Sequence, residues 1–125
     1  MHAVLQSPLR RLLSRSVCEI EYLGRRSGRL IRLPVQYARD GDRIVVVAGA
    51  AGTKRWWRNF AGASRAVTVD IAGEHHGGWA RVVGSGEPAY ERALAVYRKR
   101  FDAVPEGGFQ LVTIDLVRAW QGIRH

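Results

Sequence analysis

The sequence has little of the chemistry that small enzymes carry in their own side chains. It contains a single cysteine, Cys18, so an internal disulfide is excluded and a reducing compartment is expected. No Cys/His spacing is typical of a zinc site, and no serine elbow or metalloprotease helix motif is present. No apolar run reaches the roughly 18 residues of a membrane span, and the N-terminus lacks a signal-peptide h-region. If the protein is an enzyme, its demanding chemistry is expected to belong to a cofactor.

Acidic residues are also scarce. Eleven Asp and Glu stand against 20 Lys and Arg, which gives a formal net charge of +9, and all but two of the basic residues are arginine. One arginine cluster lies between positions 10 and 32, and a second basic cluster, at positions 54–65, contains no acid. Such a charge attracts anions: nucleic acid, lipid headgroups, or a phosphorylated or polycarboxylate ligand. The alternative is a generally arginine-rich surface that is merely well solvated.

The 125 residues fit a single domain over 1–125, with residues 1–16 as a basic N-terminal helix or arm. Alternating patterns and turn signals predict six strands joined mostly by short turns, so neighbouring strands are expected to be antiparallel. A mainly β (α+β) barrel or strongly coiled sheet follows. Pro34 removes one ladder donor, which places its strand at an edge or a bulge. The expected strands are 17–23, 30–39, 43–48, 65–72, 75–83 and 109–117; the expected helices are a short one at 54–61 and a longer one at 88–103.

The turn Gly24-Arg25-Arg26-Ser27-Gly28 is the first candidate anion site. Its glycines let the backbone close around an oxyanion, Ser27 offers a hydroxyl, and Arg26 offers a bidentate fork. The alternative is a solvated hairpin tip, because such turns are common in arginine-rich proteins.

The glycine-rich loop at 49–53 is the second candidate, because it leads into the short helix. Lys54 and Arg55 fall in the first helical turn, where cations oppose the helix dipole and a bound anion would remove the conflict. The alternative is that both side chains point into water. Trp56 and Trp57 lie about 100° apart around a helix, so one is expected in the core and the other is free to wall a ligand pocket.

These motifs, in this order, resemble the deazaflavin-dependent nitroreductase family of actinobacteria. The resemblance covers about residues 20–85 and is carried by GRRSG at 24–28, by Pro34-Val35, and by WWRNF at 56–60. Members of that family are split β-barrels related to FMN-binding pyridoxamine-phosphate-oxidase-like proteins. The resemblance therefore implies a six-stranded antiparallel split β-barrel. It also implies coenzyme F-420, an 8-hydroxy-5-deazaflavin with a phosphate and a polyglutamate tail, with FMN as the alternative cofactor.

The resemblance also implies where the cofactor would bind. Arg26 and the loop-to-helix turn would contact the phosphate, and the ring would lie near the end of the strand at 43–48. Arg25 and Arg29 are either solvated charges or a handle for an anionic tail. No catalytic residue and no metal are assigned. The implied cofactor-binding residues are Arg25, Arg26, Ser27, Arg32, Ala48, Gly49, Ala50, Gly52, Thr53, Lys54, Arg55 and Trp56.

The first functional hypothesis is an F-420-dependent oxidoreductase that passes a hydride to a small organic acceptor such as a quinone or nitroaromatic. A second is a non-catalytic barrel that carries or senses F-420, FMN, haem or an acyl ligand. A third is a basic nucleic-acid or membrane-surface module, although Arg-interleaved aromatics occur only at Trp56-Trp57, which argues against nucleic acid. The protein is expected to be cytoplasmic, as a monomer or homodimer, with the N-terminal helix as a candidate membrane contact.

Overall fold

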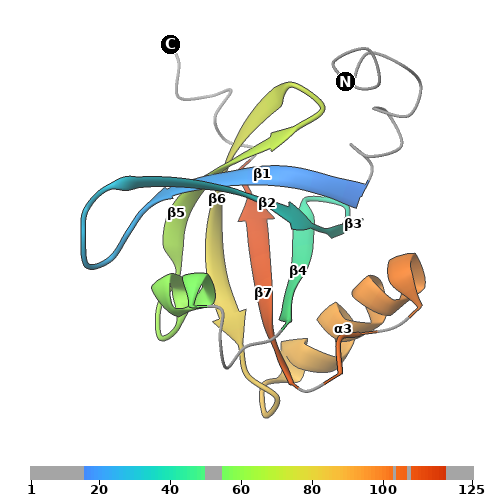
Figure 1. Cartoon of the computed structure of the whole chain (residues 1–125). Helices are drawn as coiled ribbons and strands as arrows, with labels where there is room; N and C mark the ends of the chain where they lie inside the picture. Colours follow the sequence, from blue (N-terminus) through green and yellow to red (C-terminus); the bar gives the residue numbers. More distant parts are fainter. Residues whose placement is uncertain (1–15, 50–54, 103, 107, 118–125) are drawn as a thin grey trace.

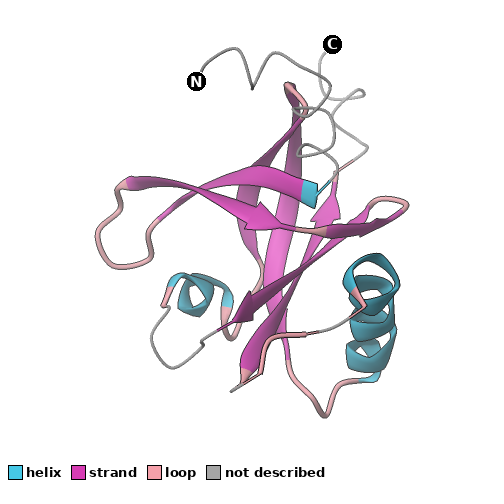
Figure 2. Ribbon diagram, turned by 45° about the vertical axis from the view of Figure 1, so that its right-hand side comes forward, coloured by secondary structure: helices cyan, strands magenta, loops and turns pink. Residues whose placement is uncertain are grey.

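The computed structural model describes residues 16–49, 55–102, 104–106 and 108–117. Within them, seven strands, one 3-10 helix and one α-helix follow one another along the chain (Figure 1). The strands make a strongly bent sheet, with the two helices on its outside (Figure 2). The elements are β1 (Val17–Leu23), β2 (Leu30–Gln36), β3 (Ala38–Asp40), β4 (Arg43–Gly49), η1 (Trp56–Phe60), β5 (Arg65–Ile71), β6 (Glu74–Val83), α3 (Pro88–Phe101) and β7 (Phe109–Leu116).

The sheet closes on itself through one bent segment. Its strand order is β2-β1-β5-β6-β7-β4-β3, and every pair is antiparallel. The two edge strands, β2 and β3, are separated only by Tyr37, whose backbone N–H donates a 2.9 Å hydrogen bond to the carbonyl of Ser16. One half of this segment pairs with β1 and the other half with β4, so the two edges of the sheet are covalently joined. The mainly β, antiparallel split-barrel prediction is thereby confirmed.

The bend at Tyr37 also changes the number of strands from the predicted six to seven. The single strand expected at 30–39 bends at Tyr37 and becomes β2 and β3, which gives seven strands instead of six. Pro34 lies on the edge strand β2, opposite Glu19 of β1, as the missing N–H donor requires. The other predicted strands are found with ends that shift by at most one residue.

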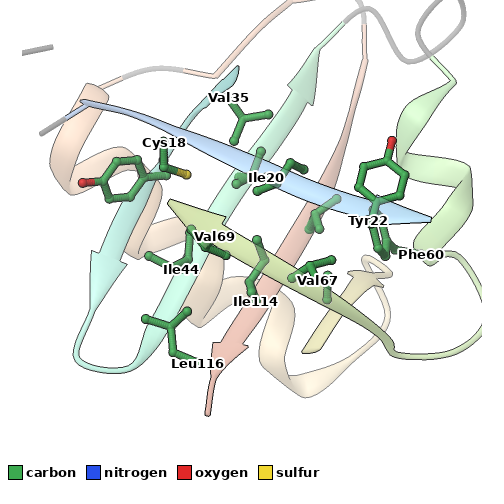
Figure 3. Packing of buried hydrophobic residues seen from close by; sticks show 14 residues of the cluster. Cys18, Ile20, Tyr22, Val35, Ile44, Phe60, Val67, Val69, Ile114 and Leu116 are labelled. Atoms are coloured by element: carbon green, nitrogen blue, oxygen red, sulfur yellow. The ribbon is translucent and has the colours of Figure 1, made fainter. Parts of the chain in front are cut away.

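Two apolar clusters share strand β4, which is buried on both faces. Ile44 and Val46 point into the barrel, where they pack with residues of β1, β5 and β7 (Figure 3). Val45 points the other way and packs against Leu94 and Tyr97 of α3. The helix therefore closes one outer face of the sheet. Burial on both faces explains why β4 has so few polar residues.

The helices partly match their predictions. α3 begins at Pro88 as expected and ends at Phe101, two residues early. The short helix expected at 54–61 is a 3-10 helix of five residues that begins at Trp56, and position 54 lies outside the described residues. Within the described residues, no helix combines the length and hydrophobicity needed to cross a bilayer.

Candidate functional site

The GRRSG turn between β1 and β2 is held closed by its own hydrogen bonds. The Gly24 N–H donates to the carbonyl of Arg29 and the Gly28 N–H donates to the carbonyl of Gly24, both at 2.9 Å. The Arg29 N–H donates to the hydroxyl oxygen of Ser27 at 3.1 Å. Gly28 has a φ of 69°, a backbone conformation that favours glycine. Because the Ser27 oxygen is used as an acceptor, its single hydroxyl hydrogen can still be donated to a ligand.

The turn is tied to helix η1 by Asn59. The Arg25 N–H donates a 2.8 Å hydrogen bond to Oδ1 of Asn59, and the Asn59 side-chain amide donates to the carbonyl of Trp56, also at 2.8 Å. The Asn59 amide thus bonds backbone groups of both the turn and the helix. In Figure 1 the turn projects from the left of the barrel, beside the short green helix η1. The turn therefore lies beside the short helix that follows the glycine-rich loop.

A cavity of about 270 Å³ lies where the turn and η1 meet. Four of its lining residues are arginines: Arg25 and Arg26 from the turn, and Arg55 and Arg58 from η1 and the residue before it. No carboxylate is among the described lining residues. We call this site the arginine cavity; it is lined by Gly24, Arg25, Arg26, Ser27, Ile31, Arg55, Arg58 and Asn59.

Sequence analysis did not single out Arg58 and Asn59 as site residues. The signal that could have found Arg58 is the spacing of three from Arg55. A 3-10 helix has three residues per turn, so two residues three positions apart lie on one face. A helix of five residues has little dipole to offer, so the arginine side chains dominate the field of the cavity.

Four other residues predicted to bind cofactor are described but do not line the arginine cavity. Arg32 points away from Ile31 on strand β2 and forms an exposed ion pair with Glu21. Ala48 is buried in β4, and Gly49 ends that strand so close to Pro105 that a Cβ would lie 2.9 Å from the Pro105 Cγ.

Trp56 is half-buried and packs against the core, with its ring centroid 6.3 Å from that of Phe60. Trp57 packs there too, so both tryptophans contact the core where only one was expected. The predictions for Ala50, Gly52, Thr53 and Lys54 fall on positions outside the described residues.

No His, Cys, Asp, Glu or Lys is among the described residues that line the cavity. Cys18 is buried inside the barrel, and this burial raises the pKa of its thiol to about 12, so the thiol behaves as a small apolar group. In the described part of the chain, no group of His, Cys, Asp or Glu could hold a metal ion. The cavity as described can therefore bind and orient an anion, but it offers no side chain that exchanges a proton near neutral pH.

Comparison with known proteins places this geometry in a family. Residues 9–104 match the sequence model of the family described as "F420H(2)-dependent quinone reductase". No match was found among curated protein sequences.

Solved structures share the fold at low sequence identity. An F420-H2 dependent reductase (FDR-A) superposes with a TM-score of 0.63 at 14% identity, covering 81% of this chain and 95% of its own. HutZ, the heme storage protein from Vibrio cholerae, gives a TM-score of 0.64 at 13% identity, covering 89% and 88%. A putative pyridoxamine 5'-phosphate oxidase from Listeria innocua gives 0.54 at 16% identity, covering 92% and 94%. Because the family model spans most of the sequence, this chain belongs to the F420H(2)-dependent quinone reductase family.

Proposed function

We propose that the protein is an F-420-dependent oxidoreductase that reduces a small organic acceptor, such as a quinone or a nitroaromatic. The observation that carries the proposal is the arginine cavity, in which the GRRSG turn and η1 converge on one site with four guanidinium groups. Family membership supports the cofactor. When bound, the reduced deazaflavin supplies the hydride.

The donors of the cavity fit an anionic cofactor. A guanidinium presents a planar fork of N–H groups that matches two phosphate oxygens, and such charge-assisted bonds are about twice as strong as neutral ones. Arg26 and Arg58 approach from opposite walls, one from the turn and one from η1, and Ser27 retains a hydroxyl hydrogen. We assign the phosphate to this group of donors, with Arg25 and Arg55 available to the carboxylates of the tail.

The turn is preorganised for this task. A Cβ at Gly24 would lie 2.9 Å from the Ser27 Oγ and 3.0 Å from the Ile31 Cδ1, so these two side chains can keep their positions only with glycine there. The hydrogen bond between Arg25 and Asn59 fixes the distance between the two walls before any ligand arrives. Preorganisation lowers the entropic cost of binding, so the chain's own contribution is to bind the cofactor and orient it.

The proposal is tested by titrating the protein with oxidised F-420 and, separately, with FMN, while tryptophan fluorescence is recorded. Trp56 and Trp57 lie on η1 beside the cavity, so bound F-420 is expected to quench their emission at micromolar concentration. If neither F-420 nor FMN quenches the fluorescence, the proposal is refuted. If FMN binds tightly and F-420 causes no response, the proposed cofactor is FMN and the proposed site is unchanged.

A second candidate function is cofactor or haem carriage without turnover. Two observations favour it: the likeness of the fold to HutZ, a heme storage protein, and the lack of acid–base groups in the described lining of the cavity. Stopped-flow oxidation of protein-bound reduced F-420 by menadione separates the two functions. A rate well above that of the free cofactor supports the oxidoreductase, and an equal or lower rate supports the carrier.

Light scattering on the same samples measures whether the protein is a monomer or a homodimer.

A further inference from the structure

A second basic surface lies between strand β3 and helix α3, far along the chain from the arginine cavity. It borders a groove of about 500 Å³, which we call the basic groove. The groove shares no lining residue with the arginine cavity, and Figure 1 shows α3 on the right of the barrel and η1 on the left. The lining residues are Ala38, Arg39, Asp40, Arg92, Ala95, Val96, Lys99 and Arg100.

The rim of the basic groove is strongly cationic. Four basic side chains face one carboxylate, and that carboxylate, on Asp40, is 3.8 Å from the Arg92 guanidinium. The pair is exposed, with 79% of the Arg92 side chain accessible, so water screens it and Arg92 still contributes to the field. Lys99 lies seven residues after Arg92, two helical turns along the same face of α3. An anionic surface that covers this face would meet several cations at once.

The floor of the same groove is apolar and small. Ala38 is buried, Val96 is half-buried, and Ala95 exposes its methyl group between the two turns of the helix that carry the cations. Cationic rims above a small apolar floor suit the boundary between lipid headgroups and acyl chains, where phosphates lie beside hydrocarbon.

The N-terminal sequence enters the fold beside this surface. Arg100 Nη2 donates a 2.8 Å hydrogen bond to the Ser16 hydroxyl, and Ser16 directly precedes β1. In sequence, Ser16 follows a stretch that interleaves three arginines with leucines, LRRLLSR at 9–15. The described part of the chain therefore begins, at Ser16, beside the basic groove.

We propose that the basic groove docks the protein on an anionic lipid bilayer. A second copy of this chain is a poor occupant, because each copy carries a net charge of +9 and would face like charges. Nucleic acid would use the cations but not the apolar floor, and none of the described residues that line the groove has an aromatic ring to stack on a base. A lipid surface uses both features. The docking is independent of the cofactor proposal and involves none of its residues.

The test is cosedimentation of the full-length protein with vesicles of phosphatidylcholine alone and of phosphatidylcholine mixed with phosphatidylserine. Binding to the mixed vesicles, with little binding to the neutral ones and a steep loss at high salt, is expected. Each basic residue near an anionic surface changes the affinity about five-fold, so the double variant Arg39→Gln and Lys99→Gln is expected to bind about 25-fold more weakly.

The matched control removes the same charge from the opposite side of the barrel. The double variant Arg29→Gln and Arg32→Gln lies on the β1–β2 hairpin, across the barrel from α3 (Figure 1), and should change vesicle affinity by no more than about two-fold, because salt screens charges beyond about 8 Å. Far-ultraviolet circular dichroism confirms that both variants fold. Equal losses in the two variants, absence of vesicle binding, or tighter binding to duplex DNA with the same dependence on Arg39 and Lys99 would each overturn the proposal.

Discussion

The backbone N–H of Arg25 donates a 2.8 Å hydrogen bond to Oδ1 of Asn59, which lies 34 positions later in the chain. This bond joins a hairpin turn to a 3-10 helix, and the arginine cavity lies between them. The shape of the candidate site therefore depends on one side chain that carries no charge.

Replacing Asn59 tests this link. Asn59→Ala removes the partners of the Arg25 N–H and the Trp56 carbonyl, so we expect a loss of about 1 kcal/mol in the free energy of unfolding and weaker F-420 binding. Asn59→Asp keeps the acceptor for Arg25 but places a negative charge among four arginines. It also loses the donor to the Trp56 carbonyl, so it is expected to be less stable than the wild type and to bind F-420 more weakly still. Urea unfolding and fluorescence titration measure the two effects; F-420 affinity that Asn59→Asp leaves unchanged would exclude the anion from this cavity.

Replacing an arginine that lines the cavity should weaken F-420 binding more than replacing an arginine that does not. Arg26→Ala and Arg58→Ala each remove a charge-assisted donor, so each is expected to cost about 1–3 kcal/mol of F-420 binding free energy. Arg29→Ala is the matched control, because Arg29 has the same charge in the same turn but does not line the cavity. Isothermal titration calorimetry measures all three. Equal losses for Arg26 and Arg29 would show a diffuse charge effect and not a site.

Gly24 is expected to be intolerant of a side chain. Gly24→Ala would place its Cβ 2.9 Å from the Ser27 Oγ and 3.0 Å from the Ile31 Cδ1, so both side chains must move, at a cost of about 1–3 kcal/mol in stability. Gly86→Ala is the control, since no atom lies within 4 Å of a Cβ built there. Thermal unfolding of the two variants compares them directly, and similar melting temperatures would contradict the close packing of the turn.

The burial of the Cys18 thiol makes the free energy of unfolding fall as the pH rises above about 9. The pKa of Cys18 is about 12 in the folded chain, against 9.0 for an unperturbed thiol, because burial disfavours the thiolate. Above pH 9 the unfolded chain loses this proton first, so the contribution is complete below about pH 9 and disappears as the pH rises toward 12.

Urea unfolding at a series of alkaline pH values should therefore show a smaller loss of stability in Cys18→Ala than in the wild type. Tyr22 and Tyr97, whose pKa values burial also raises, contribute in the same direction in both proteins. Parallel curves for the two proteins would mean that the thiol is accessible to water. A disulfide-exchange reagent added to the native protein at pH 8 gives an independent check, since it should react only after unfolding.

The Tyr22 hydroxyl provides a contrasting case. It is buried and has no hydrogen-bond partner in the described structure, although its ring packs edge-on against Phe60 with centroids 4.9 Å apart. An unpaired buried hydroxyl costs free energy, so Tyr22→Phe should leave the unliganded protein equally or more stable. A loss larger than about 1 kcal/mol in chemical denaturation would reveal a hydrogen bond to a buried water.

Most of the fold could be predicted from the sequence because its signals are local. Alternating residues in Val17–Leu23 and the Asp40-Gly41 turn report backbone preferences that act over a few residues. The break at Tyr37 could not be predicted in this way. Nothing in 30–39 marks a strand end, and the bend exists because one half of the segment must pair with β1 while the other half pairs with β4.

The sequence by itself determined the excess of arginine, the GRRSG turn and the family resemblance, because these depend on residue identity and spacing alone. Only the tertiary structure decided which arginines act together. Arg58 joins the cavity because η1 is a 3-10 helix that packs beside the turn, and Arg32 faces Glu21 because strand alternation points it away from its neighbour Ile31. The net charge follows from the residues alone, whereas a binding site needs several charged side chains close together. Long-range contacts such as the hydrogen bond from Arg25 to Asn59 bring them together.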